Sequence, residues 1–373
     1  MTNGTELGSI LHRTAPEAFI IEGAPATFEM VDGTRAAGIA EIDISRTSIT
    51  IRFASDQPLT LVQAVYGQSS GRISAVDGAW QAGRVNFIAS ETGGQHLFVT
   101  QELIVDHGGA DAAYTRLLFA GARLDGDIAF GGSVLLARTL SHNAVNHHDT
   151  RLGIVAPSVL DDVTIQRVLR AGSFVAGLDI EPLRYDLFAK DGALVRSRHV
   201  RGARRLARGA HSPFTGVKNA DKIAALSALL AALPDLEARG EPIVAALNNI
   251  AASNQVSELD PGAVLLLLAV QAMATYHAHG EGSPVPAVSR VSELAALNHA
   301  LDLHLSADDL ERYESLRIEL LDTGLFQKPG YESGRPQNEV KFIRDIAHLI
   351  IFRLCGYRGP YYRSETFDIQ SAG

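Results

Sequence analysis

The hydrophobic pattern of this chain changes once, near residue 212, and that change constrains the fold more than any other feature. Before it, short segments alternate apolar and polar residues, which is typical of half-buried β-strands. After it, long segments rich in Ala and Leu repeat with a helical period. The 373 residues are long enough for two domains. We expect an α+β protein, with a β-sandwich-like domain over 1–211, an all-α helical bundle over 212–362 and a loose tail over 363–373.

The first half contains many short alternating segments. The expected strands cover 42–44, 48–53, 84–88, 96–100, 102–105, 115–119 and 133–136. A short helix is expected over 163–171. The segments 180–188 and 193–200 flank Lys190-Asp191-Gly192, which predicts a hairpin because Asp-Gly tolerates the positive φ of a tight turn. Short strands with regular turns predict a sandwich or a barrel.

Six apolar-periodic segments predict the helices of the second half. They cover 221–233, 242–252, 261–279, 290–303, 307–321 and 340–355. Pro234 is expected to end the first, because proline cannot continue the hydrogen-bond ladder of a helix. Pro242 and Pro261 stand at the first turns of the next two, where a missing N–H costs nothing. Ser306-Ala307-Asp308-Asp309 resembles a capping box, and Gly324 ends the fifth segment.

The composition is that of an ordinary soluble protein, with 46% hydrophobic and 20% charged residues. The net charge of −9 argues against a surface coated for nucleic acid, although it allows a local basic patch. The single cysteine, Cys355, excludes an internal disulfide and fits a reducing cytoplasm. The longest apolar run, 263–270, is too short to cross a bilayer, and the polar N-terminus lacks an apolar signal segment. We therefore expect a cytoplasmic protein that does not bind a membrane.

Six arginines fall close together at the end of the first half. They are Arg196, Arg198, Arg201, Arg204, Arg205 and Arg208. Guanidinium groups at this density can bind phosphates by charge and by forked hydrogen-bond donation, so these residues are candidate nucleic-acid ligands. No aromatic residue lies among them, so base stacking by this segment is not expected. The alternative is a solvated strand and linker whose arginines pair with acidic groups of the helical domain.

A histidine-rich segment is a candidate metal site. It contains His142, His147, His148 and Asp149, and imidazole with carboxylate suits zinc or manganese. Adjacent His147 and His148 would point to opposite faces of a strand, however, and no further ligand can be identified. We interpret the segment as a surface loop and predict no metal and no cofactor. The sequence also has no Gly-rich phosphate loop, nucleophile elbow, zinc helix motif or kinase motif.

A further pattern lies near the C-terminus. Arg317 stands late in the fifth helical segment, and Asp322, five positions on, is followed by Thr323-Gly324 and a loop. The last helix then ends in Gly356-Tyr357-Arg358-Gly359. With this arrangement, residues 212–362 resemble a HEPN domain, an all-helical bundle of bacterial toxins, antiviral nucleases and nucleotide-binding proteins. The resemblance implies a homodimer that brings two arginine–histidine motifs together to cleave RNA.

The chain departs from that family where the chemistry depends on it. Ile318 replaces the usual polar residue, and Asp322 stands in place of the histidine. Histidine suits proton transfer because its pKa is near neutrality, whereas an exposed aspartate is ionised at pH 7 and repels phosphate. A contact between Arg317 and Asp322 would then hold the loop, with catalysis lost. Arg344 and His348, four residues apart on the last helix, share a face and form a second candidate catalytic pair.

Three functional hypotheses follow. The favoured one is a bacterial defence or toxin-type accessory protein whose degenerate HEPN-like bundle binds RNA or a nucleotide, or forms a homodimer, without catalysis. The second is an active metal-independent ribonuclease that uses Arg317 with His348 or Asp322. Arg205 and His211 have a permissible spacing for the same role but precede the bundle. The third is a ligand- or carbohydrate-binding β-domain with the bundle as a dimerising module.

Overall fold

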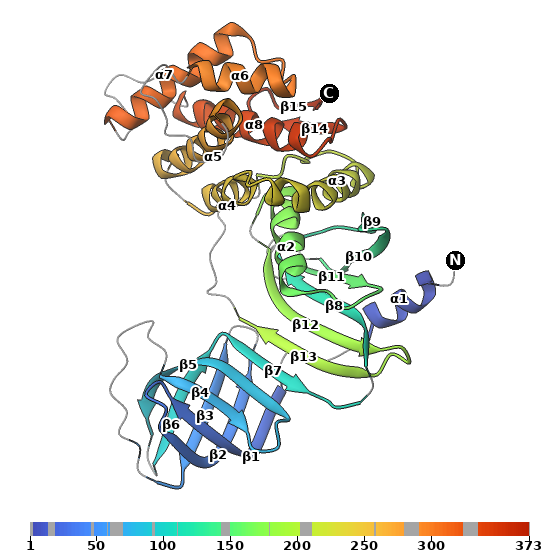
Figure 1. Ribbon diagram of the computed structural model, residues 1–373, viewed down its shortest axis with the longest axis vertical. Helices are drawn as coiled ribbons and strands as arrows, with labels where there is room; N and C mark the ends of the chain where they lie inside the picture. Colours follow the sequence, from blue (N-terminus) through green and yellow to red (C-terminus); the bar gives the residue numbers. More distant parts are fainter. Residues whose placement is uncertain are drawn as a thin grey trace. The chain divides into compact units, whose positions relative to one another are not determined.

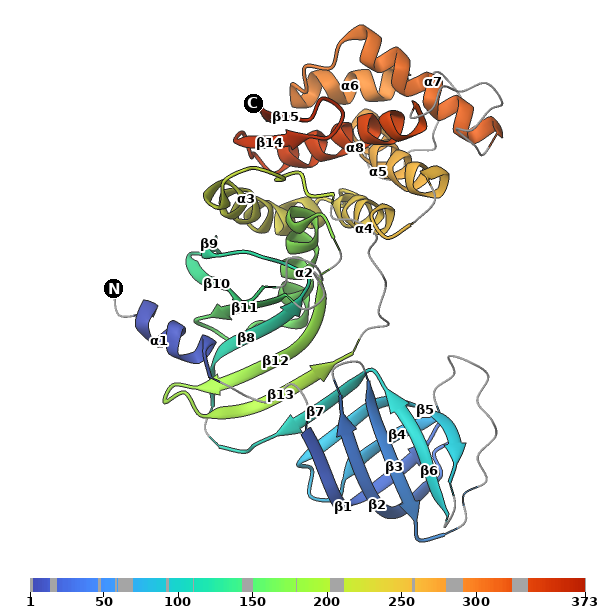
Figure 2. The same ribbon diagram turned by 180° about the vertical axis from the view of Figure 1, so that it is seen from behind.

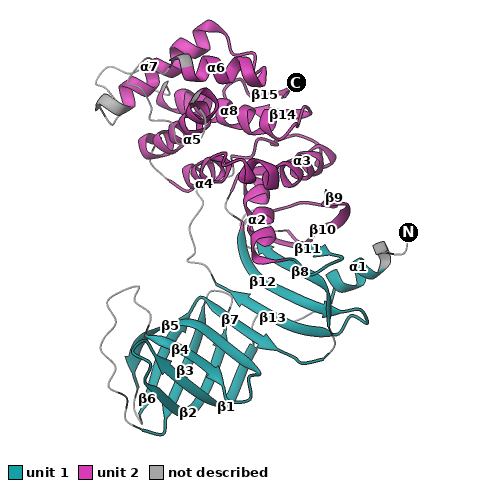
Figure 3. Ribbon diagram, viewed as in Figure 1, with its two compact units in different colours: residues 1–120, 153–160, 181–204 teal, residues 121–152, 161–180, 205–373 magenta. Residues whose placement is uncertain are grey.

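The computed structural model divides the chain into two compact units, and each is described by itself (Figure 3). Unit 1 comprises 1–120, 153–160 and 181–204, and unit 2 comprises 121–152, 161–180 and 205–373. The structure describes residues 3–13, 19–45, 48–57, 59, 70–91, 94–109, 111–142, 150–178, 180–201, 211–256, 259–279, 291–323 and 335–372.

Unit 1 contains a closed barrel of antiparallel strands (Figure 1). The strands are β1 (Phe19–Met30), β2 (Arg35–Ile44), β3 (Ile49–Ser55), β4 (Gly71–Ala75), β5 (Trp80–Ser90) and β6 (Gln95–Thr100). They pair in the order β4-β1-β2-β3-β6-β5, and pairing of β4 with β5 closes the ring. Burial alternates along β2 and β3, so the apolar side of each strand fills the barrel. Phe28, Phe53, Phe98 and the lone Trp80 belong to this core.

The closed ring corrects the prediction of a sandwich-like domain. β5 pairs with β4 along one edge and with β6 along the other, so the edges that a sandwich would leave open are joined. Alternation of apolar and polar residues is the same in both architectures, which is why the pattern alone could not separate them. The first residues of β5 also pair with β7 (Glu102–Asp106), so the sheet continues beyond the barrel.

The continuation of this sheet is the second part of unit 1. From β7 it runs through β13 (Leu194–Val200), β12 (Glu181–Ala189), β8 (Ala112–Ala120) and β11 (Arg151–Ala156). β12 and β13 form the predicted hairpin. A helix that the sequence analysis did not predict, α1 (Asn3–Leu11), buries Leu7, Ile10 and Leu11.

A buried charged network crosses β8, β12 and β13. Arg116 donates through Nε and Nη2 to Oδ2 of Asp186, at 3.1 and 2.7 Å, and Nε of Arg184 donates to Oδ1 at 2.5 Å. Arg184 also donates to Oγ of Ser197 at 2.9 Å. Arg116 donates through Nη1 to the carbonyl of Ile10, at the end of α1, at 3.1 Å. Because Asp186 is fully buried, two guanidinium groups replace water around its charge.

Unit 2 is mainly helical (Figure 2). Its helices are α2 (Asp162–Ala176), α3 (Asn219–Ala238), α4 (Ile243–Ser253), α5 (Leu259–His279), α6 (Val291–Leu301), α7 (Ala307–Thr323) and α8 (Arg335–Leu354). Two hairpins accompany them, β9 (Gly126–Phe130) with β10 (Ser133–Ser141) and β14 (Pro360–Arg363) with β15 (Asp368–Ser371). Phe352 of α8 packs against the rings of Phe174, Phe214 and Tyr361, with centroids 5.5, 5.4 and 5.4 Å away. This aromatic cluster packs α8 against α2.

The helices predicted for the C-terminal half are present, with shifted ends. α3 runs through Pro234, which was expected to end it, and its buried leucines on both sides of the proline show that packing outweighs the missing hydrogen bond. The tail over 363–373 was expected to be loose, but it contributes β15, so this half is not all-α. Unit 2 also includes α2 and the β9–β10 hairpin, which precede the expected boundary at residue 211.

By length and composition alone, α5 could cross a membrane. A core helix of a soluble protein passes the same test. Leu266, Val270 and Met273 of α5 are buried inside unit 2.

Candidate functional site

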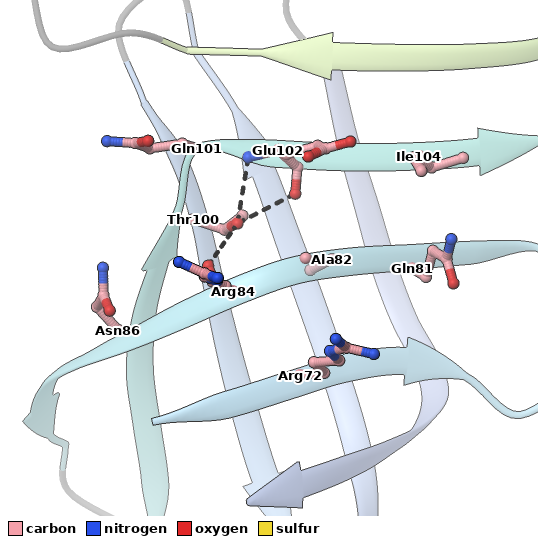
Figure 4. Close-up of a pocket in the computed structure, with 10 residues that line it drawn as sticks. Arg72, Gln81, Ala82, Arg84, Asn86, Thr100, Gln101, Glu102 and Ile104 are labelled. Atoms are coloured by element: carbon pink, nitrogen blue, oxygen red, sulfur yellow. Dashed lines mark hydrogen bonds between the residues drawn. The ribbon is translucent and has the colours of Figure 1, made fainter. Parts of the chain in front are cut away.

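The outer surface of the barrel carries an open polar groove with a volume of about 580 Å³ (Figure 4). It lies where β4, β5 and the junction of β6 with β7 meet. The residues that line it are Arg72, Gln81, Ala82, Gly83, Arg84, Asn86, Thr100, Gln101, Glu102 and Ile104. The groove therefore has two guanidinium groups, three primary amides and one carboxylate, with Ala82, Gly83 and Ile104 between them.

Strand alternation puts these side chains on the outside. On β4, Ile73 is buried and Arg72 is exposed, and on β5, Ala82 and Val85 are buried while Arg84 is exposed. The inward residues belong to the barrel core, so the polar residues between them must face solvent.

Thr100 holds the corner where β6 turns into β7 (Figure 4). Its hydroxyl lies 3.0 Å from the carbonyl oxygen of Arg84 and 3.1 Å from that of Glu102. The hydroxyl oxygen also accepts the N–H of Glu102 at 3.2 Å. The corner thus fixes the backbone on which Arg84 and Glu102 stand.

The groove arginines differ from other arginines of the barrel. Among the described residues, neither Arg72 nor Arg84 has a hydrogen bond or an ion pair through its guanidinium group. By contrast, Arg35 pairs with Glu29 at 3.3 Å, and Arg52 pairs with Glu41 at 3.1 Å. The one groove carboxylate, Glu102, is neutralised by Arg198 at 2.6 Å. The groove therefore presents positive charge to solvent.

This chemistry suits binding rather than catalysis. Guanidinium and amide groups donate hydrogen bonds to phosphate or carboxylate oxygens. The lining contains no histidine, cysteine or aromatic side chain. The sequence analysis missed this site, because Arg72 and Arg84 are single charges on separate strands. In the sequence, the only sign of the groove is that each arginine is a charged residue at an outward position of an alternating segment.

The predicted arginine cluster lies on β13 and just after it, and its described members have protein partners. Arg196 pairs with Asp106 at 2.6 Å, and Arg198 pairs with Glu102. Arg201 is buried and donates to the carbonyls of Ser45, Leu183 and Val200 at 2.8, 2.9 and 2.8 Å. Arg204, Arg205 and Arg208 lie outside the described residues. The partners named for these three arginines belong to unit 1.

On α7, the local partner of Arg317 is a glutamate one turn earlier. Nε of Arg317 donates to Oε2 of Glu314 at 2.7 Å, and Nη2 donates to Oε1. This hydrogen bonding raises the pKa of Arg317. Ile318 is exposed. Asp322 belongs to α7, but its side chain lies outside the described part of the structure.

Arg344 and His348 are together on α8, and both are buried. The guanidinium Nε of Arg344 and Nδ1 of His348 have no hydrogen-bond partner. Burial, with the charge of Arg344 nearby, lowers the pKa of His348 to about 3. His211 is the third member of the group, since Arg344 and His348 each interact electrostatically with it. The charged groups that act on Arg317 are Glu314, Tyr313 and Glu293, none of which belongs to α8.

The remaining candidates do not form a site. Nδ1 of His142 lies 3.4 Å from Oγ1 of Thr150, and His147, His148 and Asp149 lie outside the described residues. Within the part of the chain that the structure describes, no three His, Cys, Asp or Glu side chains could hold a metal ion. Burial raises the pKa of the Cys355 thiol to about 12, which makes it an unreactive core residue.

Comparisons of the chain with protein-family models, characterised proteins and solved structures found no significant match. The functional conclusion therefore depends on the chemistry of two places. One is the open groove of unit 1, and the other is the pair of buried side chains Arg344 and His348 on α8 of unit 2.

Proposed function

We propose that this protein binds RNA without cleaving it, through the barrel groove and mainly by contacts with the phosphate backbone. The observation that carries this proposal is the pair of unpartnered arginines, Arg72 and Arg84, in an open groove of about 580 Å³. Three amide side chains beside them, Gln81, Asn86 and Gln101, can donate to phosphate and sugar oxygens.

The groove chemistry defines the expected mode of binding. Each arginine that neutralises a phosphate of a single strand should add about 0.7 to the dependence of log affinity on log salt concentration. No aromatic side chain lines the groove, so bases have no stacking platform and sequence preference should be low. The same absence disfavours a carbohydrate as the ligand, because sugar rings commonly pack on aromatic side chains.

The resemblance of residues 212–362 to HEPN domains supports choosing RNA among the polyanions. In this proposal the helical unit belongs to an accessory protein with a degenerate motif and forms a homodimer. The engagement of Arg317 by Glu314 supports the loss of catalysis. The burial of His348 supports it too, because a neutral ring with a pKa of about 3 cannot donate a proton to a leaving group at pH 7.

Fluorescence anisotropy with a labelled single-stranded RNA, measured over a salt series, tests the proposal. The double variant Arg72→Ala/Arg84→Ala should lose about tenfold or more in affinity, and its salt slope should fall by about 1.4. The matched control is Arg35→Ala/Arg52→Ala, which removes two paired arginines from the same barrel. This control should bind almost like wild type.

Two outcomes would contradict the proposal. If both double variants lose affinity equally, net charge and not the groove determines binding. If the wild type binds RNA without any salt dependence, phosphate contacts are not involved. The RNA is also examined for cleavage without added metal, since metal-independent products would support the ribonuclease alternative. Light scattering at micromolar concentration tests the homodimer.

A further inference from the structure

α8 of unit 2 contains a buried arginine, Arg344, that forms no ion pair with a described residue. Burial lowers its pKa to about 10, and the charge of the adjacent Asp345 acts in the opposite direction. Arg344 is 5% exposed, and its Nε has no hydrogen-bond partner. One turn later, His348 is 1% exposed, and its Nδ1 also has no partner. The ring of Phe174 packs edge-on against His348, with centroids 5.3 Å apart, and holds the imidazole in place. The two side chains, each with a nitrogen that has no hydrogen-bond partner, therefore lie on one face of the helix.

Other buried arginines of the protein show how such a charge is normally compensated. Arg116 and Arg184, which are 1% and 4% exposed, share the carboxylate of Asp186. A buried arginine without a partner is costly, because it has lost its hydration and gained no opposite charge. An unsatisfied buried group in a native protein requires an explanation, and a bound ion is one such explanation.

The surroundings of Arg344 are positive. Lys341 precedes it by one turn, and His211 comes from the segment that packs on α8. Partial loss of hydration, and then the positive charges of Arg344 and Lys341, lower the pKa of His211 to about 4. The neighbouring acid is Asp345, whose carboxylate accepts the backbone N–H groups of Ser364 and Glu365, each at 2.9 Å. The Asp345 carboxylate therefore stabilises the loop between β14 and β15 through these hydrogen bonds.

We propose that Arg344, His348 and His211 form a binding site for a phosphate-class oxyanion, either free phosphate or the terminal phosphate of a larger molecule. A tetrahedral dianion has enough acceptor oxygens to satisfy the guanidinium group and an imidazole together. His211 is exposed and gives the anion an approach from solvent. The site lies in unit 2, so it does not depend on the proposed RNA binding by the barrel.

Isothermal titration calorimetry with inorganic phosphate tests the site, with sodium chloride keeping the ionic strength constant. The wild type should bind phosphate, and Arg344→Met should lose binding at least about tenfold, because it removes the main donor. Arg344→Met should also melt at a temperature equal to or above that of the ligand-free wild type, since an apolar side chain replaces an unpaired buried charge. His348→Leu is the second variant, and it should weaken phosphate binding as well.

The control is Arg138→Met, which changes an exposed arginine of unit 2 that pairs with Asp127 at 3.4 Å. It should bind phosphate like the wild type. A nucleoside monophosphate distinguishes free phosphate from the terminal phosphate of a larger molecule. Tighter binding than that of inorganic phosphate indicates the larger molecule, and equal or weaker binding indicates free phosphate. Absence of binding for both probes overturns the proposal. So does unchanged binding by Arg344→Met.

Discussion

At the scale of single residues, burial decides which ionisable groups can act. His199 in unit 1 and His348 in unit 2 have pKa values lowered to about 3, first by loss of hydration and then by nearby arginines. Both rings are neutral at pH 7. Arg317, by contrast, is charged and forms an ion pair with Glu314. Arg317 and His348, the two described candidates of the expected ribonuclease motif, are therefore in different charge states at pH 7.

The first residue-scale prediction concerns His348 and pH. Because its folded pKa of about 3 is below its ordinary value of 6.5, the unfolded state binds more protons between these limits. The stability associated with His348 is fully present above pH 6.5 and is lost as the pH falls. Between pH 6.5 and about 5, this residue alone should cost about 2 kcal/mol. Urea denaturation of wild type and His348→Leu at several pH values should show that difference.

His299→Leu, which changes an exposed position of α6, is the control and should follow the wild type. Comparing each variant with the wild type at the same pH cancels the contributions of other titratable groups to the free energy of unfolding. One such group is Asp345, whose pKa burial raises to about 6, so that its contribution is lost as the pH rises. If the curves of wild type and His348→Leu are parallel, His348 is not buried as a neutral group.

The second residue-scale prediction concerns the shared carboxylate of Asp186. Asp186→Asn leaves two guanidinium groups, those of Arg116 and Arg184, buried without an opposite charge. The free energy of unfolding should fall by about 3–5 kcal/mol. Asp106→Asn breaks a more exposed pair with Arg196 in the same sheet and should cost about 1 kcal/mol or less. Equal losses in the two variants would contradict a structural role for the buried network.

At the scale of elements, Gly177 connects the end of α2 with the segment at His211, which leads into α3. Gly177 has a φ of 69° and closes α2 by donating to the carbonyls of Ser173 and Phe174. Its own carbonyl accepts the backbone N–H of His211 at 2.9 Å and the side-chain amide of Asn254 at 3.2 Å. A Cβ at this position would lie 2.0 Å from the backbone nitrogen of Ser212. Both the left-handed conformation and the close approach require glycine.

Gly177→Ala should therefore destabilise the protein by about 3 kcal/mol, through backbone strain and forced displacement of the neighbouring chain. The control is Gly356→Ala, at the end of α8, where φ is 71° but a Cβ would meet no atom within 4 Å. It should cost about 1 kcal/mol from strain alone. Thermal unfolding followed by circular dichroism measures both. A cost for Gly177→Ala no larger than the control would mean that the close approach is not maintained.

At the scale of the whole molecule, the two proposed sites belong to different units and should be separable. Arg72→Ala/Arg84→Ala should lose RNA binding and keep phosphate binding, since the groove is built from unit 1 alone. Arg344→Met should show the reverse. Anisotropy and calorimetry on the same three proteins test this expectation. Loss of both activities in either variant would indicate one shared site or a general effect on folding.

Much of the secondary structure could be predicted from the sequence, because alternation and helical periodicity are properties of neighbouring residues. The β12–β13 hairpin followed from Asp191-Gly192, and the helices of the second half followed from their apolar stripes. The strands β1, β4, β9, β11, β14 and β15 were not predicted. The pairing of Arg317 with Glu314 did have a local signal, since a glutamate three residues before an arginine on a helix shares its face.

The sequence by itself determined that this chain is α+β, that its net charge is −9 and that it has no internal disulfide, because these properties depend on local pattern or on composition. Only the tertiary structure decided that the strands close into a barrel, since closure depends on which edges meet. It also placed Arg72 beside Arg84 on one groove, and Arg344 and His348 beside His211. Packing, not spacing along the chain, determines whether such a charge finds a partner.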